Sequence, residues 1–122
     1  MLTDQSEDQS QLLELAVTNL GVIEHASLLF GPGMTAITGE TGAGKTLLVT
    51  ALQLLSGGRS DSSLVGVYGE EAIIEGRFFF EGGEIILQRT IPREGRSRAY
   101  VDGRISSIAF LQELSEPIVE IH

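Results

Sequence analysis

The sequence predicts a mixed α/β fold in one domain of 122 residues, or in a piece of one. Two observations lead to this prediction. A short β-type run enters a glycine-rich loop that continues into an apolar helix pattern, and the second half of the chain has the pattern of antiparallel strands. We therefore expect a helix-containing part together with an antiparallel β-subdomain.

Three strands are expected before the first helix, after a polar, acidic and flexible tail over residues 1–11. Apolar and β-branched residues dominate 12–17 and 22–30, and Asn19-Leu20-Gly21 is expected to turn the chain between them. A further short run over 34–38 is suited to a buried strand. This third strand leads directly into the glycine-rich loop.

The glycine-rich loop, residues 39–46, matches the pattern G-x-x-x-x-G-K-[ST] at every fixed position. Glycine lets the backbone N–H groups turn inward and leaves room for phosphate oxygens. We expect Lys45 to reach the β- and γ-phosphates of a nucleoside triphosphate and to neutralise developing charge as a catalytic residue, and the Thr46 hydroxyl to bind Mg²⁺. The candidate nucleotide-binding residues are Gly39, Glu40, Thr41, Gly42, Ala43, Gly44, Lys45 and Thr46.

The helix expected over 46–56 is apolar around most of its circumference, which predicts burial on several sides. Gly57-Gly58 is expected to end this helix, because glycine is preferred just past a helix C-terminus. The polar loop that follows, 59–63, is a candidate contact to the nucleotide or to a partner.

The remaining chain predicts an antiparallel meander. Residues 72–80 are expected to pair with 84–91 across Gly82-Gly83, and the strand 98–101 is expected to turn at Asp102-Gly103, a favoured hairpin dipeptide.

A short amphipathic helix is expected to follow the meander, capped by Ser106 or Ser107. Pro117 is expected to start a last strand over 118–121.

The net charge of −9 argues against a broad nucleic-acid-binding surface on this chain alone, because phosphate contacts need clustered Lys and Arg. Two interpretations of the arginine-rich segment 89–104 remain open: a local basic patch, and a solvated hairpin whose arginines pair with acids elsewhere. This segment contains Arg89, Arg93, Arg96, Arg98 and Arg104.

No apolar run approaches the roughly 20 residues that span a bilayer, so we expect no membrane partner. The sequence contains no cysteine, which excludes a disulfide framework and fits a reducing compartment. A cytoplasmic location is expected by default.

Acidic and basic residues outside the loop offer weaker candidates. Glu81 and Asp102 follow apolar strands, as a Mg²⁺-holding acid does in P-loop enzymes, but both are expected at hairpin turns. Glu120 has a better context but lies at the end of the sequence. His25 has no nucleophile pattern nearby and is interpreted as a strand-face residue.

These motifs resemble the N-terminal part of the RecN family, bacterial DNA-repair ATPases of the SMC and ABC type. The resemblance covers residues 12–122, and its most specific segments are 15–20, 33–46, 51–59, 95–103 and 119–122. It implies the N-terminal lobe of an ABC/SMC-type ATPase head that binds ATP and Mg²⁺ through residues 39–46.

The resemblance also implies what lies outside this sequence. Family members continue past His122 with Gly-Gln, a coiled coil and a C-terminal lobe that carries the signature motif, the metal-holding Asp and the catalytic Glu. The implied partners are this C-terminal lobe, a second head by dimerisation, and DNA through the full-length protein, in the bacterial cytoplasm at the nucleoid. We expect the chain alone to be nearly inactive as an ATPase. Gly66 stands where relatives often have Arg, so any role of that Arg is in doubt.

Two alternative functions remain open. A small P-loop kinase or GTPase uses the same loop, although such proteins usually place it on the first strand of an alternating α/β sequence. A stand-alone nucleotide-binding or dimerisation module is the non-enzymatic alternative.

Overall fold

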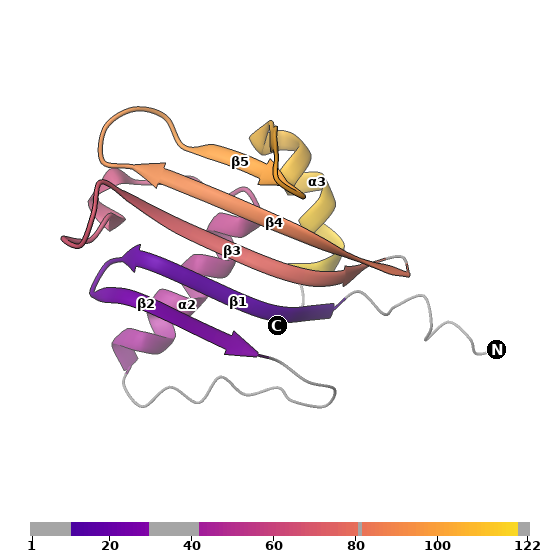
Figure 1. Ribbon diagram of the computed structural model, residues 1–122, viewed down its shortest axis with the longest axis horizontal. Coiled ribbons are helices and arrows are strands. Elements are labelled where there is room, and N and C mark those ends of the chain that lie inside the picture. Colours follow the sequence, from indigo (N-terminus) through magenta and orange to yellow (C-terminus); the bar gives the residue numbers. More distant parts are fainter. Residues whose placement is uncertain (1–10, 30–41, 81, 120–122) are drawn as a thin grey trace.

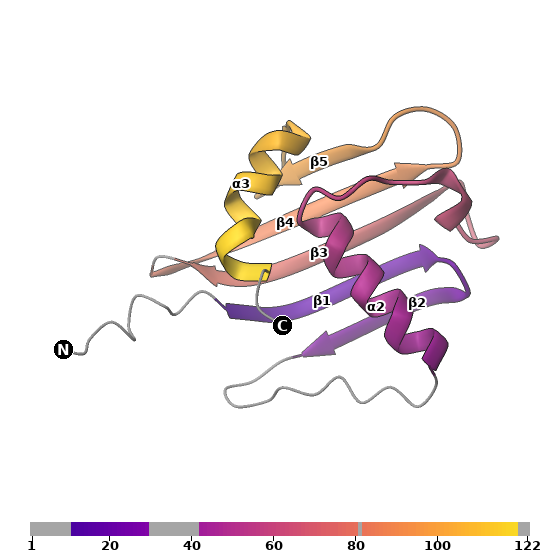
Figure 2. The same cartoon turned by 180° about the vertical axis from the view of Figure 1, so that it is seen from behind.

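The computed structural model describes residues 11–29, 42–80 and 82–119. These residues form a six-stranded sheet in the order β2-β1-β3-β4-β5-β6, in which all paired neighbours are antiparallel. Helices α2 (Gly42–Leu55) and α3 (Ile108–Val119) both lie against one face of this sheet (Figures 1 and 2). The predicted combination of helices with an antiparallel sheet is therefore confirmed.

The first two predicted strands are confirmed. They are β1 (Gln11–Leu20) and β2 (Ile23–Leu29), so β1 includes Gln11, the last residue of the predicted tail. β1 pairs with β2 on one side and with β3 (Glu71–Phe80) on the other, so the chain returns to the sheet beside β1 after α2. The strand predicted over 34–38 lies outside the described residues.

The predicted meander is also confirmed. β3 pairs with β4 (Gly83–Pro92) over their whole length, with Phe80 opposite Gly83. The strands β5 (Arg98–Val101) and β6 (Arg104–Ser106) meet at Asp102-Gly103, where both residues have positive φ, 51° and 83°. This is the conformation that a type I′ hairpin requires, and Asp and Gly adopt it readily.

The core lies between the helix-covered face of the sheet and the two helices. Alternate residues of the strands point into it, because successive side chains of a strand lie on opposite faces. The core residues at 2% exposure or less are Leu15, Val17, Leu20, Ala72, Ile74, Phe78, Leu87, Ile91 and Ala99 from the sheet, with Ala51, Leu54, Leu55 and Leu111 from the helices. Each larger side chain contributes about 1.5–3 kcal/mol by leaving water.

Gly76 sets the distance between α2 and the sheet. A Cβ atom at this position would lie 2.7 Å from Cδ1 of Leu55 and from Cε1 of Phe78, which is closer than real Cβ contacts. Glycine therefore lets the C-terminal half of α2 pack directly on β3.

Two predicted boundaries are wrong. α2 begins at Gly42, not at Thr46. Glycine is unfavourable inside a helix, but this cost does not prevent residues 42–45 from forming the first turn. Residues 118 and 119 belong to α3 and not to a strand. Pro117 lies near the end of this helix and removes only one N–H from it. The helix continues to Val119 because the residues before Pro117 are good helix formers.

Candidate functional site

The predicted phosphate-binding residues fall at the start of α2. The backbone of Gly42, Ala43, Gly44, Lys45 and Thr46 forms the first residues of the helix. Gly39, Glu40 and Thr41 lie outside the described residues. The described half of the motif therefore coincides with a helix N-terminus.

This helix start has the electrostatic character of an anion site. The first four N–H groups of any α-helix lack an intrahelical acceptor, and the helix dipole places partial positive charge there. The first turn of α2 contains no acidic residue that would compete for these N–H groups. The backbone of residues 42–46 at this helix start therefore fits a bound phosphate group.

The β1–β2 turn supports α2 close to this start. Gly21, with φ of 59°, lies against Leu47: a Cβ atom added at Gly21 would be 3.1 Å from Cδ2 of Leu47. Leu47 is in the second turn of α2, directly after the motif. The turn between the first two strands is thus a packing partner of the helix that begins the candidate site.

Asn19 fixes this turn to the segment after α2. Its side chain is 1% exposed, its Nδ2 donates to the carbonyl of Glu71 at 3.0 Å, and its Oδ1 accepts from the N–H of Tyr68 at 2.9 Å. Its own carbonyl accepts from the N–H of Gly66 at 3.0 Å. The predicted turn residue therefore connects two segments whose bonded residues are 47 to 52 positions apart in the sequence.

Gly66 is buried in this connection. A Cβ atom there would lie 2.5 Å from the carbonyl oxygen of Gly21 and 2.6 Å from Oδ1 of Asn19. Because both atoms belong to a tight, hydrogen-bonded turn, a larger residue at 66 requires the loop to shift. Local packing therefore favours glycine at position 66.

The other end of α2 is closed by a glycine motif. The N–H of Gly57 donates to the carbonyl of Leu54 at 3.1 Å, and the N–H of Gly58 donates to the carbonyl of Gln53 at 2.9 Å. Together with φ of 93° at Gly57, these are the two hydrogen bonds of a Schellman motif. The predicted helix stop is confirmed.

Arg89 of β4 adds a charged group to the same helix end. Its Nη1 donates to the carbonyl of Leu54 at 2.7 Å and to the carbonyl of Gly58 at 2.9 Å. The residue is 2% exposed, and burial lowers the pKa of its guanidinium from the ordinary value. Arginine nevertheless stays protonated at neutral pH, so a buried positive charge faces the negative end of the helix dipole.

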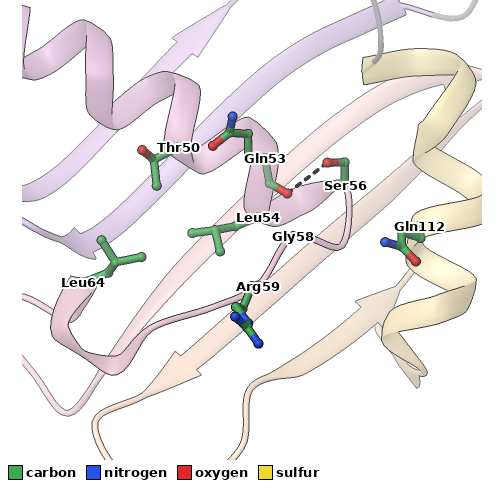
Figure 3. A pocket seen from close by; sticks show the side chains of 8 residues that line it. All are labelled: Thr50, Gln53, Leu54, Ser56, Gly58, Arg59, Leu64 and Gln112. Carbon is green, nitrogen blue, oxygen red and sulfur yellow. Dashed lines mark hydrogen bonds between the residues drawn. The ribbon is translucent and has the colours of Figure 1, made fainter.

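A cavity of about 350 Å³ lies beside the C-terminal half of α2 (Figure 3). Gln112 of α3 borders it, and the other lining residues come from α2 and the segment that follows it, with Arg59 among them. The lining residues are Thr50, Gln53, Leu54, Ser56, Gly58, Arg59, Leu64 and Gln112. The polar loop 59–63 therefore begins at the helix end opposite to Gly42, and the structure does not bring Arg59 to the described part of the motif, residues 42–46.

The arginine-rich segment does not form one patch. Arg89 is buried, and Nη2 of Arg93 donates to the carbonyls of Gly66, at 2.7 Å, and Gly69, while its Nε lies 3.7 Å from the Glu70 carboxylate. The remaining members, Arg96, Arg98 and Arg104, are exposed. Two of the five arginines thus bind backbone carbonyls, Arg89 in the interior and Arg93 at the surface.

The weaker candidates have local roles. Oδ1 of Asp102 accepts from the N–H of Ile86 at 2.9 Å, and the exposed His25 lies 3.2 Å from the Thr18 hydroxyl. Glu81 and Glu120 lie outside the described residues. Within the described ranges, no group of three or more His, Cys, Asp or Glu residues is arranged to hold a metal ion, and no helix is long and apolar enough to cross a membrane.

Sequence comparison connects the chain with DNA repair proteins. A protein-family model described as AAA domain matches residues 14–107. The DNA repair protein RecN of Streptomyces coelicolor is 40% identical over 125 residues, which cover 88% of this chain and 22% of that protein. RecN of Bacillus subtilis is 36% identical over 129 residues, covering 91% and 22%. The chain therefore spans about one fifth of the length of these relatives.

Structural comparison gives the same class of fold. A solved structure from work on ATP-driven dimerization and DNA-stimulated activation of SMC ATPases superposes with a TM-score of 0.77 at 19% identity, over 92% of this chain and 81% of that one. The recombination mediator protein RecF, solved with ATPrS, has a TM-score of 0.76 at 27% identity, over 86% of this chain and 30% of that one.

Proposed function

Because this chain belongs to the AAA domain family and corresponds to the N-terminal part of RecN, we propose that it is the ATP-binding lobe of a bacterial ATPase in recombinational repair of DNA double-strand breaks. Its fold is that of the N-terminal lobe of an ABC- or SMC-type ATPase head. The observation that carries the proposal is the phosphate-loop pattern at the first turn of α2, in a chain 36–40% identical to RecN.

Each motif residue has a separate role in this proposal. The backbone N–H groups of 39–44 surround the phosphates, and Lys45 neutralises negative charge on the β- and γ-phosphates. The Thr46 hydroxyl binds Mg²⁺, which supplies further charge neutralisation when it is present. These residues orient and bind the nucleotide, which is the larger part of what a phosphoryl-transfer site does.

Hydrolysis requires groups that the described residues do not supply. No base that orients an attacking water has been identified among them, and the carboxylate of Asp102 is engaged in a hairpin. We propose that the C-terminal lobe of the parent protein and a second head supply the remaining groups, that DNA is bound by the full-length protein, and that the protein acts in the cytoplasm at the nucleoid.

A binding titration tests the nucleotide proposal. The chain is titrated with a fluorescent ATP analogue in the presence of Mg²⁺, and saturable binding is expected. Lys45→Ala should weaken binding at least about 100-fold, because it removes a charge-assisted contact to phosphate. The matched control is Arg98→Ala, which removes an exposed positive charge from β5. Equal affinity of the chain and Lys45→Ala would contradict the proposal.

The metal role of Thr46 has its own matched pair. Thr46→Ser keeps the hydroxyl and should keep the Mg²⁺ dependence of binding, whereas Thr46→Val has a similar shape without the hydroxyl and should lose it. If Thr46→Val retains the full Mg²⁺ dependence, this residue is not a metal ligand.

Turnover and self-association separate the proposal from its alternatives. The chain alone should hydrolyse ATP negligibly, and turnover that Lys45→Ala abolishes would show a self-sufficient enzyme. The kinase or GTPase alternative is disfavoured because every described strand pairing is antiparallel, whereas those enzymes use parallel sheets. A stand-alone dimerisation module should show a concentration-dependent sedimentation coefficient without nucleotide.

A further inference from the structure

Arg89 is the one charged side chain that is buried among the described residues. Its guanidinium makes no salt bridge with the carboxylates of those residues; its partners are two carbonyls and a hydroxyl. The two carbonyls belong to Leu54 and Gly58, at the C-terminal end of α2. The hydroxyl is that of Ser97, which accepts from Nε at 3.3 Å and from Nη2 at 3.0 Å.

The strand that carries Arg89 gives it a fixed origin. β4 is paired on both sides, with Ile74 of β3 and Ala99 of β5 opposite Arg89. Ser97 holds the other edge of the guanidinium from the segment between β4 and β5. The sheet therefore fixes the backbone of Arg89, and Ser97 binds Nε and Nη2 of its planar guanidinium. Nη1 of the same guanidinium determines where the end of α2 lies.

A buried positive charge is a costly way to fill space. Burial of an ion carries a desolvation cost, and apolar residues of similar volume often stabilise a core as well or better. What the guanidinium adds is direction: two hydrogen bonds from one nitrogen fix the position of the helix end. A packed apolar side chain has no such preference.

A fixed C-terminal end also constrains the other end of the helix. α2 is continuous from Gly42 to Leu55, about 20 Å of rigid helix. A tilt or shift at Leu54 therefore moves the first turn, where the phosphate motif lies. We propose that Arg89 is a positioning residue for the phosphate-binding end of α2, acting through Leu54 and Gly58; this inference rests on the proposed nucleotide function.

The test compares two conservative substitutions in the chain of 122 residues. Arg89→Lys keeps the positive charge but loses the planar fork, whereas Arg98→Lys makes the same change at an exposed position of β5. Affinity for the fluorescent ATP analogue with Mg²⁺ is measured at a temperature where circular dichroism shows both variants fully folded. A role in stability alone would lower Tm and leave this affinity unchanged.

We expect Arg89→Lys to weaken nucleotide binding about tenfold, in the range seen when a group that orients a ligand-binding residue is removed. Arg98→Lys should bind within twofold of the unmutated chain. Affinity of Arg89→Lys within twofold of the unmutated chain would overturn the inference while leaving the proposed function intact. Absence of binding by the unmutated chain would instead remove the proposed function, and this inference with it.

A second pair keeps the test decisive if Arg89→Lys does not fold. Ser97→Ala removes one partner of the guanidinium, and Ser97→Thr retains the hydroxyl. Ser97→Ala should weaken binding about threefold, since one neutral partner of a charged group contributes less than the group itself, and Ser97→Thr should bind like the unmutated chain. Equal binding by Ser97→Ala and Ser97→Thr would overturn the inference.

Discussion

The two ends of α2 are built in opposite ways. At the C-terminal end, the carbonyl groups of Gln53, Leu54 and Gly58 all accept hydrogen bonds. The last turn of α2 contains no basic residue, and the positive charge at this end belongs to Arg89 of β4. At the N-terminal end, the first turn consists of the phosphate motif and contains no acidic residue. The C-terminal end is therefore satisfied by groups of the protein itself, whereas the N-terminal end is the one that we propose binds an external anion.

Charge reversal at the N-terminal end should give the largest effect and should separate binding from stability. Lys45→Glu places a carboxylate where phosphate is proposed to bind, so affinity for Mg²⁺-ATP should fall by at least about 1,000-fold. The same change puts a negative charge at the positive end of a helix dipole, which contributes about 0.3–1 kcal/mol of stability. We therefore expect Tm without nucleotide to be unchanged or slightly raised. A large loss of Tm would show that the N-terminal end of α2 contributes to stability as the C-terminal end does.

Substitution of Asn19 tests the support of α2 by the β1–β2 turn. Asn19→Ala removes two buried side-chain hydrogen bonds and places alanine at φ of 56°, so the free energy of unfolding should fall by about 3 kcal/mol. Asn19→Gly accommodates the positive φ and removes only the hydrogen bonds. Denaturant unfolding should therefore rank the unmutated chain above Asn19→Gly and Asn19→Gly above Asn19→Ala. Equal stability of all three would show that the hydrogen bonds of Asn19 do not support this part of the fold.

Glycine at the C-terminal end should be more sensitive than glycine in an open turn. Gly57→Ala imposes a positive φ of 93° on alanine and places Cβ 2.5 Å from Cγ of Gln112, so we expect a loss of about 2 kcal/mol. Gly82→Ala has a similar φ of 84° with no atom within 4 Å of the new Cβ, so it should lose about 1 kcal/mol. Thermal unfolding of both variants measures the difference. Equal losses would mean that contact with α3 does not constrain this helix end.

A half-buried arginine of β3 provides the smallest expected effect. Arg77 forms ion pairs with Glu14 at 3.1 Å and Glu84 at 3.3 Å, and the hydrogen bond that it donates to Glu14, more than the attraction of Glu84, raises the pKa of its guanidinium. Because these pairs face solvent, Arg77→Ala should barely change Tm, and any change should shrink further in high salt. Arg89→Met, by contrast, should lower Tm clearly, because the Gly58 carbonyl and the Ser97 hydroxyl would lose the group that donates to them. Similar Tm losses would contradict the distinction between the two sites.

Much of this fold could be predicted because its signals are local. The Asp102-Gly103 turn, the β3–β4 hairpin and the Gly57-Gly58 helix stop depend on residues that are neighbours in the sequence. The Ser107 hydroxyl also accepts from the N–H of Phe110 at 3.0 Å, as expected of a residue that caps α3. Backbone preferences of glycine, aspartate and serine are sufficient to identify such features.

The supports of the site could not be predicted because they depend on long-range contacts. Arg89 was one basic residue among five in a segment interpreted as a patch or a solvated hairpin, and nothing local distinguishes it from Arg98. Its contact with Leu54 joins residues 35 apart, and that of Asn19 with Glu71 joins residues 52 apart. An asparagine before a glycine turn signals positive φ, but not the segment that its amide will bind.

Hydrogen exchange measured with and without Mg²⁺-ATP tests directly whether residues 39–46 bind the nucleotide. If residues 39–46 bind the phosphates, amides of this segment should exchange more slowly when nucleotide is present, because their N–H groups then have acceptors. The change should be absent in Lys45→Glu, and Gly57 and Gly58 should be protected equally in both states because their N–H groups already bind carbonyls. Nucleotide-dependent protection that appears elsewhere in the chain and not at 39–46 would contradict the account.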